Sequence, residues 1–217
     1  LTRYYAEAGN PPGFWMGSGV AQFGSGQITA GAAVTERQLQ LLIGLGCDPV
    51  TGEQLGEPYR TYSRRDARFA ERAARLDADL NDEERGRLID EIEAEEIQKA
   101  SRSAVAGFDF TFSVPKSVSV LWGVADAASK ALIVDAHHDA VAQVLALLER
   151  EVAATRMGVH GRAGAVAQKA VVGVAATAYD HWDSRAGDPQ LHTHVVVANK
   201  ARTVDDGKWR TLDGQAL

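Results

Sequence analysis

The stretch that decides the fold reads Tyr179-Asp180-His181-Trp182-Asp183-Ser184-Arg185-Ala186-Gly187-Asp188-Pro189-Gln190-Leu191-His192-Thr193-His194, followed by Val195-Val196-Val197-Ala198. His192 and His194 begin a β-branched run, and alternate residues of a strand point to the same face. His181, at the end of an earlier apolar segment, can supply a third imidazole. Three imidazoles held by strands form a ligand set for a divalent metal with an open position. Histidine pairs with this spacing also occur without a metal, so the residues alone leave both interpretations open.

A second strand is predicted from Gly107 to Ser113, where three phenylalanines alternate with polar residues. The phenylalanines must face the core, so Asp109 points to the opposite face, where metal ligands could lie. An acid in such a position is otherwise simply exposed. Ser113 is predicted to cap the next helix, with Pro115 in its first turn. Lys116 and the free amide groups of that turn could then contact a phosphate.

The other elements fit around these strands. Thr35 to Gln38 form a capping box for a helix through Ile43. Asp126 caps a long helix to about Thr155, and 165–179 reads as one strand. Asp206-Gly207 marks a hairpin. The long helix has a predicted buried stripe of Leu132, Ile133, Ala136, Val141, Val144, Leu145, Leu148 and Val152. Its adjacent residues His137 and His138 cannot share a face, so they are expected to be structural or solvated. These elements predict an α+β fold, a two-layer arrangement in which helices pack on one face of an antiparallel sheet.

Charge is unevenly distributed along the chain. The net charge is −6, and the eight acids and two arginines from Asp82 to Glu96 account for all of it. The rest is close to neutral, so a local basic surface for DNA is not excluded. Asn81 opens this acidic helix, which is expected to lie away from DNA. Residues Tyr59 to Arg68 mix aromatics with arginines, and read either as a DNA-contacting segment or as a solvated connection.

Four motifs resemble, in order, those of conjugative relaxases of the MobF class (TrwC/TraI type), which are three-histidine (HUH) endonucleases. They are H-x10-H-x-H with S-R-x-x-D-P-Q-L between the histidines, 107–119, Lys208 to Leu212, and the opening Arg3 to Gly9. The region at about 59–106 matches no motif of the family and is expected to be an insertion. The resemblance also implies that 1–217 is a relaxase fragment incomplete at both ends.

The resemblance assigns roles to particular residues. It implies a metal (Mg, Mn or Zn) on His181, His192 and His194, with Asp109 orienting a ligand or accepting a proton. Tyr4 and Tyr5 match the second of two tyrosine positions, so one of them is the candidate nucleophile. An equivalent of the first position is expected upstream of Leu1. Candidate DNA contacts are Lys116, Arg162, Lys169 and Arg185.

The implied activity is site- and strand-specific nicking of single-stranded DNA at a plasmid origin of transfer, through a 5′-phosphotyrosine. Other transfer proteins are expected partners, and a helicase domain is expected downstream. Two alternatives remain, a rolling-circle replication initiator and a DNA-binding remnant without activity. The one cysteine, Cys47, excludes an internal disulfide framework and fits a reducing, cytoplasmic compartment. No signal peptide and no membrane span are expected, because no run approaches about 18 apolar residues.

Overall fold

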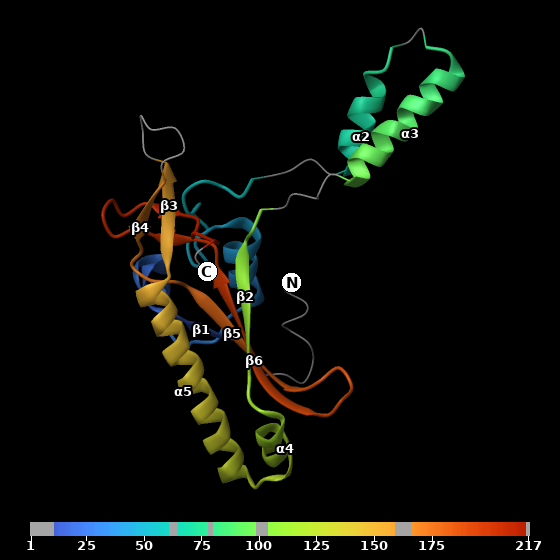
Figure 1. Cartoon of the computed structure of the whole chain (residues 1–217). Helices are drawn as coiled ribbons and strands as arrows, with labels where there is room; N and C mark the ends of the chain where they lie inside the picture. Colours follow the sequence, from blue (N-terminus) through green and yellow to red (C-terminus); the bar gives the residue numbers. More distant parts are fainter. Residues whose placement is uncertain (1–10, 61–64, 78–79, 99–103, 159–165, 216–217) are drawn as a thin grey trace. The chain divides into compact units, whose positions relative to one another are not determined.

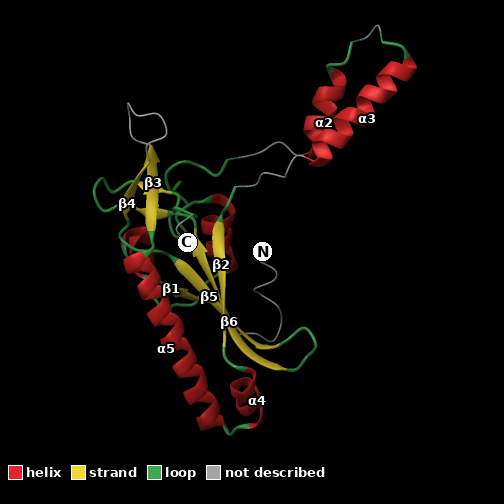
Figure 2. Cartoon of the chain, in the orientation of Figure 1, coloured by secondary structure: helices red, strands yellow, loops and turns green. Residues whose placement is uncertain are grey.

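The chain is described from a computed structural model that covers residues 11–60, 65–77, 80–98, 104–158 and 166–215. Its main sheet is antiparallel, with the strand order β1-β5-β6-β2 (Figure 1). Figure 2 shows these strands together with the helices that pack on them. The predicted α+β class is therefore confirmed. The strands are β1 (Phe14–Met16), β2 (Gly107–Ser113), β5 (Ala176–Asp183) and β6 (Pro189–Ala198).

The chain divides into two compact units, and the smaller, Tyr59–Val105, contains the helices α2 (Arg65–Ala74) and α3 (Asp82–Gln98). The side chain of Glu96 is only 2% exposed and accepts hydrogen bonds from Arg68 Nε at 2.8 Å and Arg72 Nη1 at 2.9 Å. Arg68 thus joins α2 to α3. It belongs to the segment Tyr59 to Arg68, for which DNA contact is one of the two predictions. The insertion of this unit into a family fold stays a prediction.

Helix α5 (Ala127–Glu151) packs against one face of the main sheet. Val141 and Leu145 join a buried cluster with Val195 and Val197, and the three phenylalanines of β2 pack against it as their alternation predicted. The predicted stripe is wrong at Leu132 and Val144, which are 70% and 44% exposed, and at Ala136, which is exposed as well.

Two predicted helix boundaries are corrected. Asp126 caps α5 as predicted, since its carboxylate accepts from the amides of Ala128 and Ser129. However, α5 ends at Glu151, because Thr155 pairs with Lys169 in a separate hairpin. Helix α4 (Lys116–Val124) begins after Pro115, whose carbonyl accepts from the amides of the first turn, so Ser113 is not its cap.

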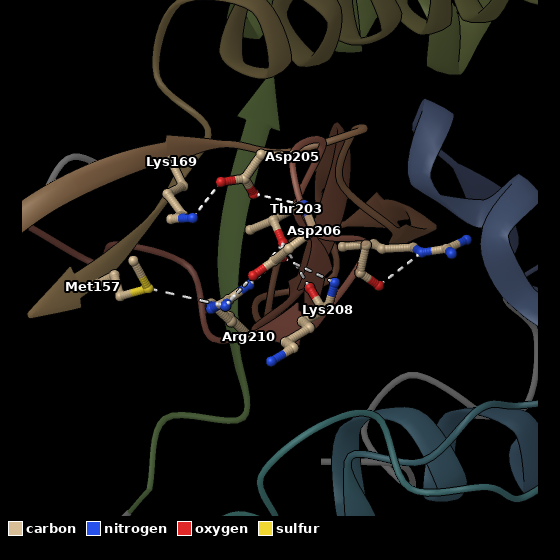
Figure 3. Close-up of polar contacts among 9 residues, drawn as sticks. Met157, Lys169, Thr203, Asp205, Asp206, Lys208 and Arg210 are labelled. Atoms are coloured by element: carbon tan, nitrogen blue, oxygen red, sulfur yellow. Dashed lines mark hydrogen bonds and ion pairs between the residues drawn. The ribbon is translucent and has the colours of Figure 1, made fainter.

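The predicted strand from 165 to 179 is two strands in different sheets. β4 (Val166–Ala170) pairs with β3 (Ala154–Gly158), and β5 enters the main sheet. The predicted hairpin at Asp206-Gly207 is confirmed, as β7 (Ala201–Arg202) and β8 (Trp209–Arg210). Figure 3 shows that its turn is fixed by Arg210, whose guanidinium donates to both oxygens of Asp206 at 2.8 and 2.6 Å and to Thr203 Oγ1 at 2.7 Å.

The opposite face of the main sheet is covered at one end by the N-terminal segment. This segment contains η2 (Ser18–Ser25), a π-helical turn η3 (Gln40–Leu45) and α1 (Glu36–Leu39), whose predicted capping box is present. Trp15 and Phe23 are buried there against Tyr179 and Val196. Tyr179 and Val196 share this face with the histidines, because they lie two residues from His181 and His194.

Among the described residues, α5 is the one helix that could cross a membrane by length and composition, with a mean hydropathy of 1.4 over 18 residues. A core helix of a globular domain meets the same criteria, and α5 buries His137, Val141 and Leu145 in the fold. The expectation of no membrane span rested on unbroken apolar runs and stays a prediction.

Candidate metal centre

The three predicted ligands converge on one face of β5 and β6. His181 on β5 lies directly opposite His192 on β6, and His194 follows two residues later on the same face. Their ring centroids are 5.1 to 5.3 Å apart. One nitrogen from each ring lies within 4.8 Å of the others. His181 is buried, and the other two are half-buried.

Asp109 lies beside this cluster and fixes one ligand. His194 Nδ1 is 3.0 Å and 3.2 Å from the two carboxylate oxygens of Asp109, and 3.3 Å from Thr111 Oγ1. An ionised carboxylate can only accept, so Nδ1 must carry the proton. In the neutral ring, Nε2 is then a lone-pair donor. Thr111, which the sequence analysis did not single out, faces His194 because the two residues are register partners.

His192 is fixed in the same tautomer by the backbone. Its Nδ1 lies 2.8 Å from the carbonyl oxygen of Gln190. A carbonyl has no proton to give, so Nδ1 is again the donor and Nε2 keeps its lone pair. No sequence pattern predicts this bond, because it depends on how the chain enters β6.

The donor set fits a divalent metal. Neutral imidazoles bind such ions well, and three protein ligands leave a position open for a substrate oxygen. Bonds from the second ring nitrogen to a carboxylate or carbonyl are the usual means of holding metal-ligating histidines. His192 and His194 both have such a bond. We therefore describe the cluster as a divalent-metal site.

A buried polar network lies under the histidines, on the opposite face of the same strands. Thr193 Oγ1 donates to Asp180 Oδ1 at 2.6 Å, and His138 Nε2 donates to Asp180 Oδ2 at 2.8 Å. His137 Nε2 lies 2.9 Å from Thr193 Oγ1 and must be the donor, because the threonine proton goes to Asp180. The predicted structural role of His137 and His138 is thus confirmed. The reason given for it is wrong, because both rings reach this one network and their centroids lie 6.1 Å apart. Alternation could have identified Asp180 and Thr193, since each adjoins a metal-ligating histidine.

These contacts shift the pKa values of the network. Burial lowers the pKa of His137, and the bond from His138 to Asp180 raises the pKa of His138. Burial works to raise the pKa of Asp180, but the bonds from His138 and Thr193 outweigh it, so that pKa is lowered. The network is most favourable with Asp180 ionised and His138 protonated.

The loop between His181 and His192 is held from α4. Lys116 Nζ donates to Asp188 Oδ2 and, at 2.8 Å, to the carbonyl of Pro189, while Ser184 Oγ donates to Asp188 Oδ1. The Lys116 bond, followed by the Ser184 bond, lowers the pKa of Asp188. Arg185 is exposed within this loop. Of the predicted DNA contacts, Lys116 is thus paired with Asp188, and its phosphate role stays a prediction.

The remaining predicted contacts are placed as follows. Lys169 on β4 pairs with Asp205 in the turn of the β7–β8 hairpin, and its side chain is 19% exposed (Figure 3). Its DNA contact also stays a prediction. Arg162, Tyr4 and Tyr5 lie outside the described residues.

Comparisons with known proteins agree with this geometry. The TrwC relaxase family model matches residues 2–217. Two TraI multifunctional conjugation proteins, from Escherichia coli and its strain K12, are 39% and 37% identical over 132 residues, which is 61% of this chain. The chain spans about 7% of these relatives.

Two solved structures of the conjugative relaxase TrwC with oriT DNA resemble the whole fold. The metal-bound structure matches 99% of this chain with a TM-score of 0.64 and 26% sequence identity. The metal-free structure matches 99% of this chain with a TM-score of 0.63 and 25% sequence identity. The chain spans 57% and 56% of those chains. Since the family model covers nearly the entire sequence, this chain belongs to the TrwC relaxase family.

Proposed function

We propose that this chain is a metal-dependent transesterase that nicks one strand of DNA at a plasmid origin of transfer in conjugation. The observation that carries the proposal is the cluster of His181, His192 and His194 with Asp109 on one ligand, in a chain of the TrwC relaxase family. The TrwC relatives are complexes with oriT DNA. We assign single-stranded DNA as substrate on that similarity.

In the proposed reaction, a tyrosine oxygen attacks the scissile phosphorus. The nucleophile is Tyr4 or Tyr5. Its phenol is neutral near pH 7, with a pKa of about 10, so a base must take the proton. Asp109 is the candidate base, with a side chain 37% exposed beside the histidines. A tyrosine–phosphate ester forms as the bond from phosphorus to the 3′-oxygen breaks, and the proton taken from the tyrosine balances the one that the 3′-oxygen gains as it leaves as a hydroxyl.

The metal supplies positive charge that polarises the phosphate and offsets the charge that develops on it. The protein holds two of the ligands in the correct tautomer through Asp109 and Gln190. Because the phosphate ester is conserved in the tyrosine adduct, the strand can later be rejoined. A nuclease that attacks with water forms no ester with the protein, so the cleaved strand cannot be rejoined in this way.

The test is a covalent adduct assay. Incubating the chain with a single-stranded transfer-origin oligonucleotide and Mn²⁺ should give a protein–DNA adduct that survives denaturation. We expect Tyr4→Phe or Tyr5→Phe to abolish it, because phenylalanine has no oxygen to attack phosphorus. An oligonucleotide of scrambled sequence controls for site specificity. Binding without adduct by the unaltered chain would contradict the proposal and favour a DNA-binding remnant, and adduct at a replication origin alone would favour an initiator.

Arg185 is the described residue that we propose as a phosphate contact. It is exposed in the loop braced by Asp188, between two of the metal ligands. We expect Arg185→Ala to weaken binding of single-stranded DNA uniformly across sequences. The slope of log K against log salt should become less negative by about 0.7, the value for one phosphate contact. Fluorescence anisotropy at several salt concentrations measures both, with the exposed Arg150→Ala on α5 as control. An unchanged slope would exclude the contact.

We propose further assignments with the function. Imidazole donors favour Zn²⁺ over Mg²⁺ and Mn²⁺, which oxygen ligands suit better. A helicase domain in the full-length protein is proposed from the similarity to TraI. Other transfer proteins as partners, and a cytoplasmic location, follow from the proposed role.

A further inference from the structure

An irregularity in strand pairing lies next to the metal ligands. His181 pairs with His192, but the next aligned pair is Asp183 with Pro189. One residue of β5, Trp182, therefore faces two residues of β6, Gln190 and Leu191. An extra residue of this kind disrupts the ladder and turns the local backbone.

The peptide unit between Gln190 and Leu191 is bonded at both ends. Its carbonyl accepts from His192 Nδ1 at 2.8 Å. Its amide, the N–H of Leu191, donates to Ser119 Oγ at 3.1 Å. The N–H and C=O of a trans peptide are coplanar and point in opposite directions. A bond that fixes the direction of the amide therefore fixes the direction of the carbonyl.

Ser119 is held where it can do this. It lies on α4, its residue is 0% exposed, and its own amide bonds to the carbonyl of Pro115. Two nearby contacts hold α4 against the same strands: the rings of Trp122 and Trp182 stack at 5.0 Å, and the amide of Val114 donates to the carbonyl of Leu191 at 3.3 Å. The buried Leu191 amide would be costly to leave without an acceptor.

We propose that Ser119 is a positioning residue for the metal site. Through the Gln190–Leu191 peptide it holds His192 in the tautomer that leaves Nε2 available to a divalent metal. The inference rests on the metal site of the proposed function. It deepens that proposal by extending the site to Ser119, a buried residue of α4 that is not one of the three clustered ligands.

The decisive measurement is the tautomer of His192 in the metal-free protein, read from long-range ¹H–¹⁵N NMR of the imidazoles. We expect the unaltered chain to hold His192 with its proton on Nδ1. Ser119→Ala should shift it to a mixture of tautomers. His194 should not change in that variant, because Asp109 fixes it independently. Ser119→Thr keeps the hydroxyl and should restore the unaltered spectrum.

Metal binding gives a second readout. Titration with Mn²⁺ alone should show an affinity about 10-fold lower for Ser119→Ala, the size of effect that outer-shell partners have. Ser117→Ala, on the exposed side of the same helix, is the matched control and should bind as the unaltered chain does. Thermal melts of each variant show whether it is folded.

Several results would overturn the proposal. One is a folded Ser119→Ala protein with an unchanged His192 tautomer, whatever its stability or metal affinity. Another, which needs no variant, is an unaltered chain with its His192 proton on Nε2. Failure of the proposed function can be told apart from failure of this proposal. The tautomer of His192 can still be measured by NMR in a chain that binds no Mn²⁺ or forms no adduct.

Discussion

Replacing His192 with alanine is expected to reduce DNA nicking by more than about 100-fold while leaving DNA affinity nearly unchanged. Loss of a partner in the outer shell of a metal site already costs about 10- to 100-fold in affinity or activity, and His192 is one of only three clustered nitrogen donors in the described chain. Its removal leaves two ligands. DNA affinity depends chiefly on contacts to the phosphate backbone, which this substitution does not touch.

The measurement pairs a nicking assay with Mn²⁺ and an anisotropy titration of an uncleaved transfer-origin oligonucleotide. Asp183→Asn is a suitable control, because Asp183 is exposed and lies in the register pair next to His181 and His192 without belonging to the histidine cluster. Equal loss of cleavage and binding would show that His192 serves the DNA interface or the fold and not a metal.

The metal site was the most predictable part of the structure. Alternation in strands determines which side chains share a face, and this sufficed to bring His192 and His194 together and to turn Asp109 toward them while Phe110 faced the core. The contribution of His181 also followed, because an antiparallel hairpin returns the chain to the same site.

Contacts between distant segments could not be predicted in the same way. The run from 165 to 179 looks like one strand by residue type. It breaks because the backbone at Val174 bonds to Gly19 and to Glu149, which are far away in sequence. The sequence predicts that Lys116 binds phosphate, but it does not show that Lys116 donates to Asp188, 72 residues further along the chain. The bond between Ser119 and Leu191 likewise depends on tertiary packing and on one extra residue in β6.

The exposed residues of α5 show an error in how the stripe is assigned. An α-helix turns about 100° per residue, so two positions nine residues apart lie on opposite sides of it. Leu132 precedes the buried Val141 by nine residues, and it is accordingly 70% exposed although it belongs to the predicted stripe. Its neighbours Ile133 and Val134 are half-buried, so this end of the helix is covered on the side that faces the fold.

Replacing Asp180 with alanine is expected to lower the free energy of unfolding by about 3 kcal/mol, the lower end of the cost of breaking a buried ion pair. Asp180 is 5% exposed and accepts from both Thr193 and His138. Without it, the buried hydroxyl of Thr193 and the imidazole of His138 both lose their acceptor. For a chain of this size, the melting temperature should fall by about 6 to 12 °C.

The pH dependence of this loss identifies its cause. The lowered pKa of Asp180 stabilises the fold above the unfolded value of about 3.9, and this is lost as pH falls through the folded pKa. The raised pKa of His138 stabilises the fold fully below the unfolded pKa of about 6.5. This stabilisation is lost as pH rises through the pKa of His138 in the folded protein. The difference between the unaltered chain and Asp180→Ala should therefore be greatest between about pH 4 and 6.5 and should decrease above that range.

Urea unfolding of the metal-free protein at several pH values measures this difference. The lowered pKa of His137 destabilises both proteins as pH falls, so it largely cancels. Asp139→Ala, an exposed neighbour on α5, is the control, and it should change stability by less than about 0.5 kcal/mol. A deficit of the same size from pH 4 to pH 9 would mean that Asp180 acts through packing and neutral hydrogen bonds, because an ion pair with His138 cannot persist once the imidazole has lost its proton.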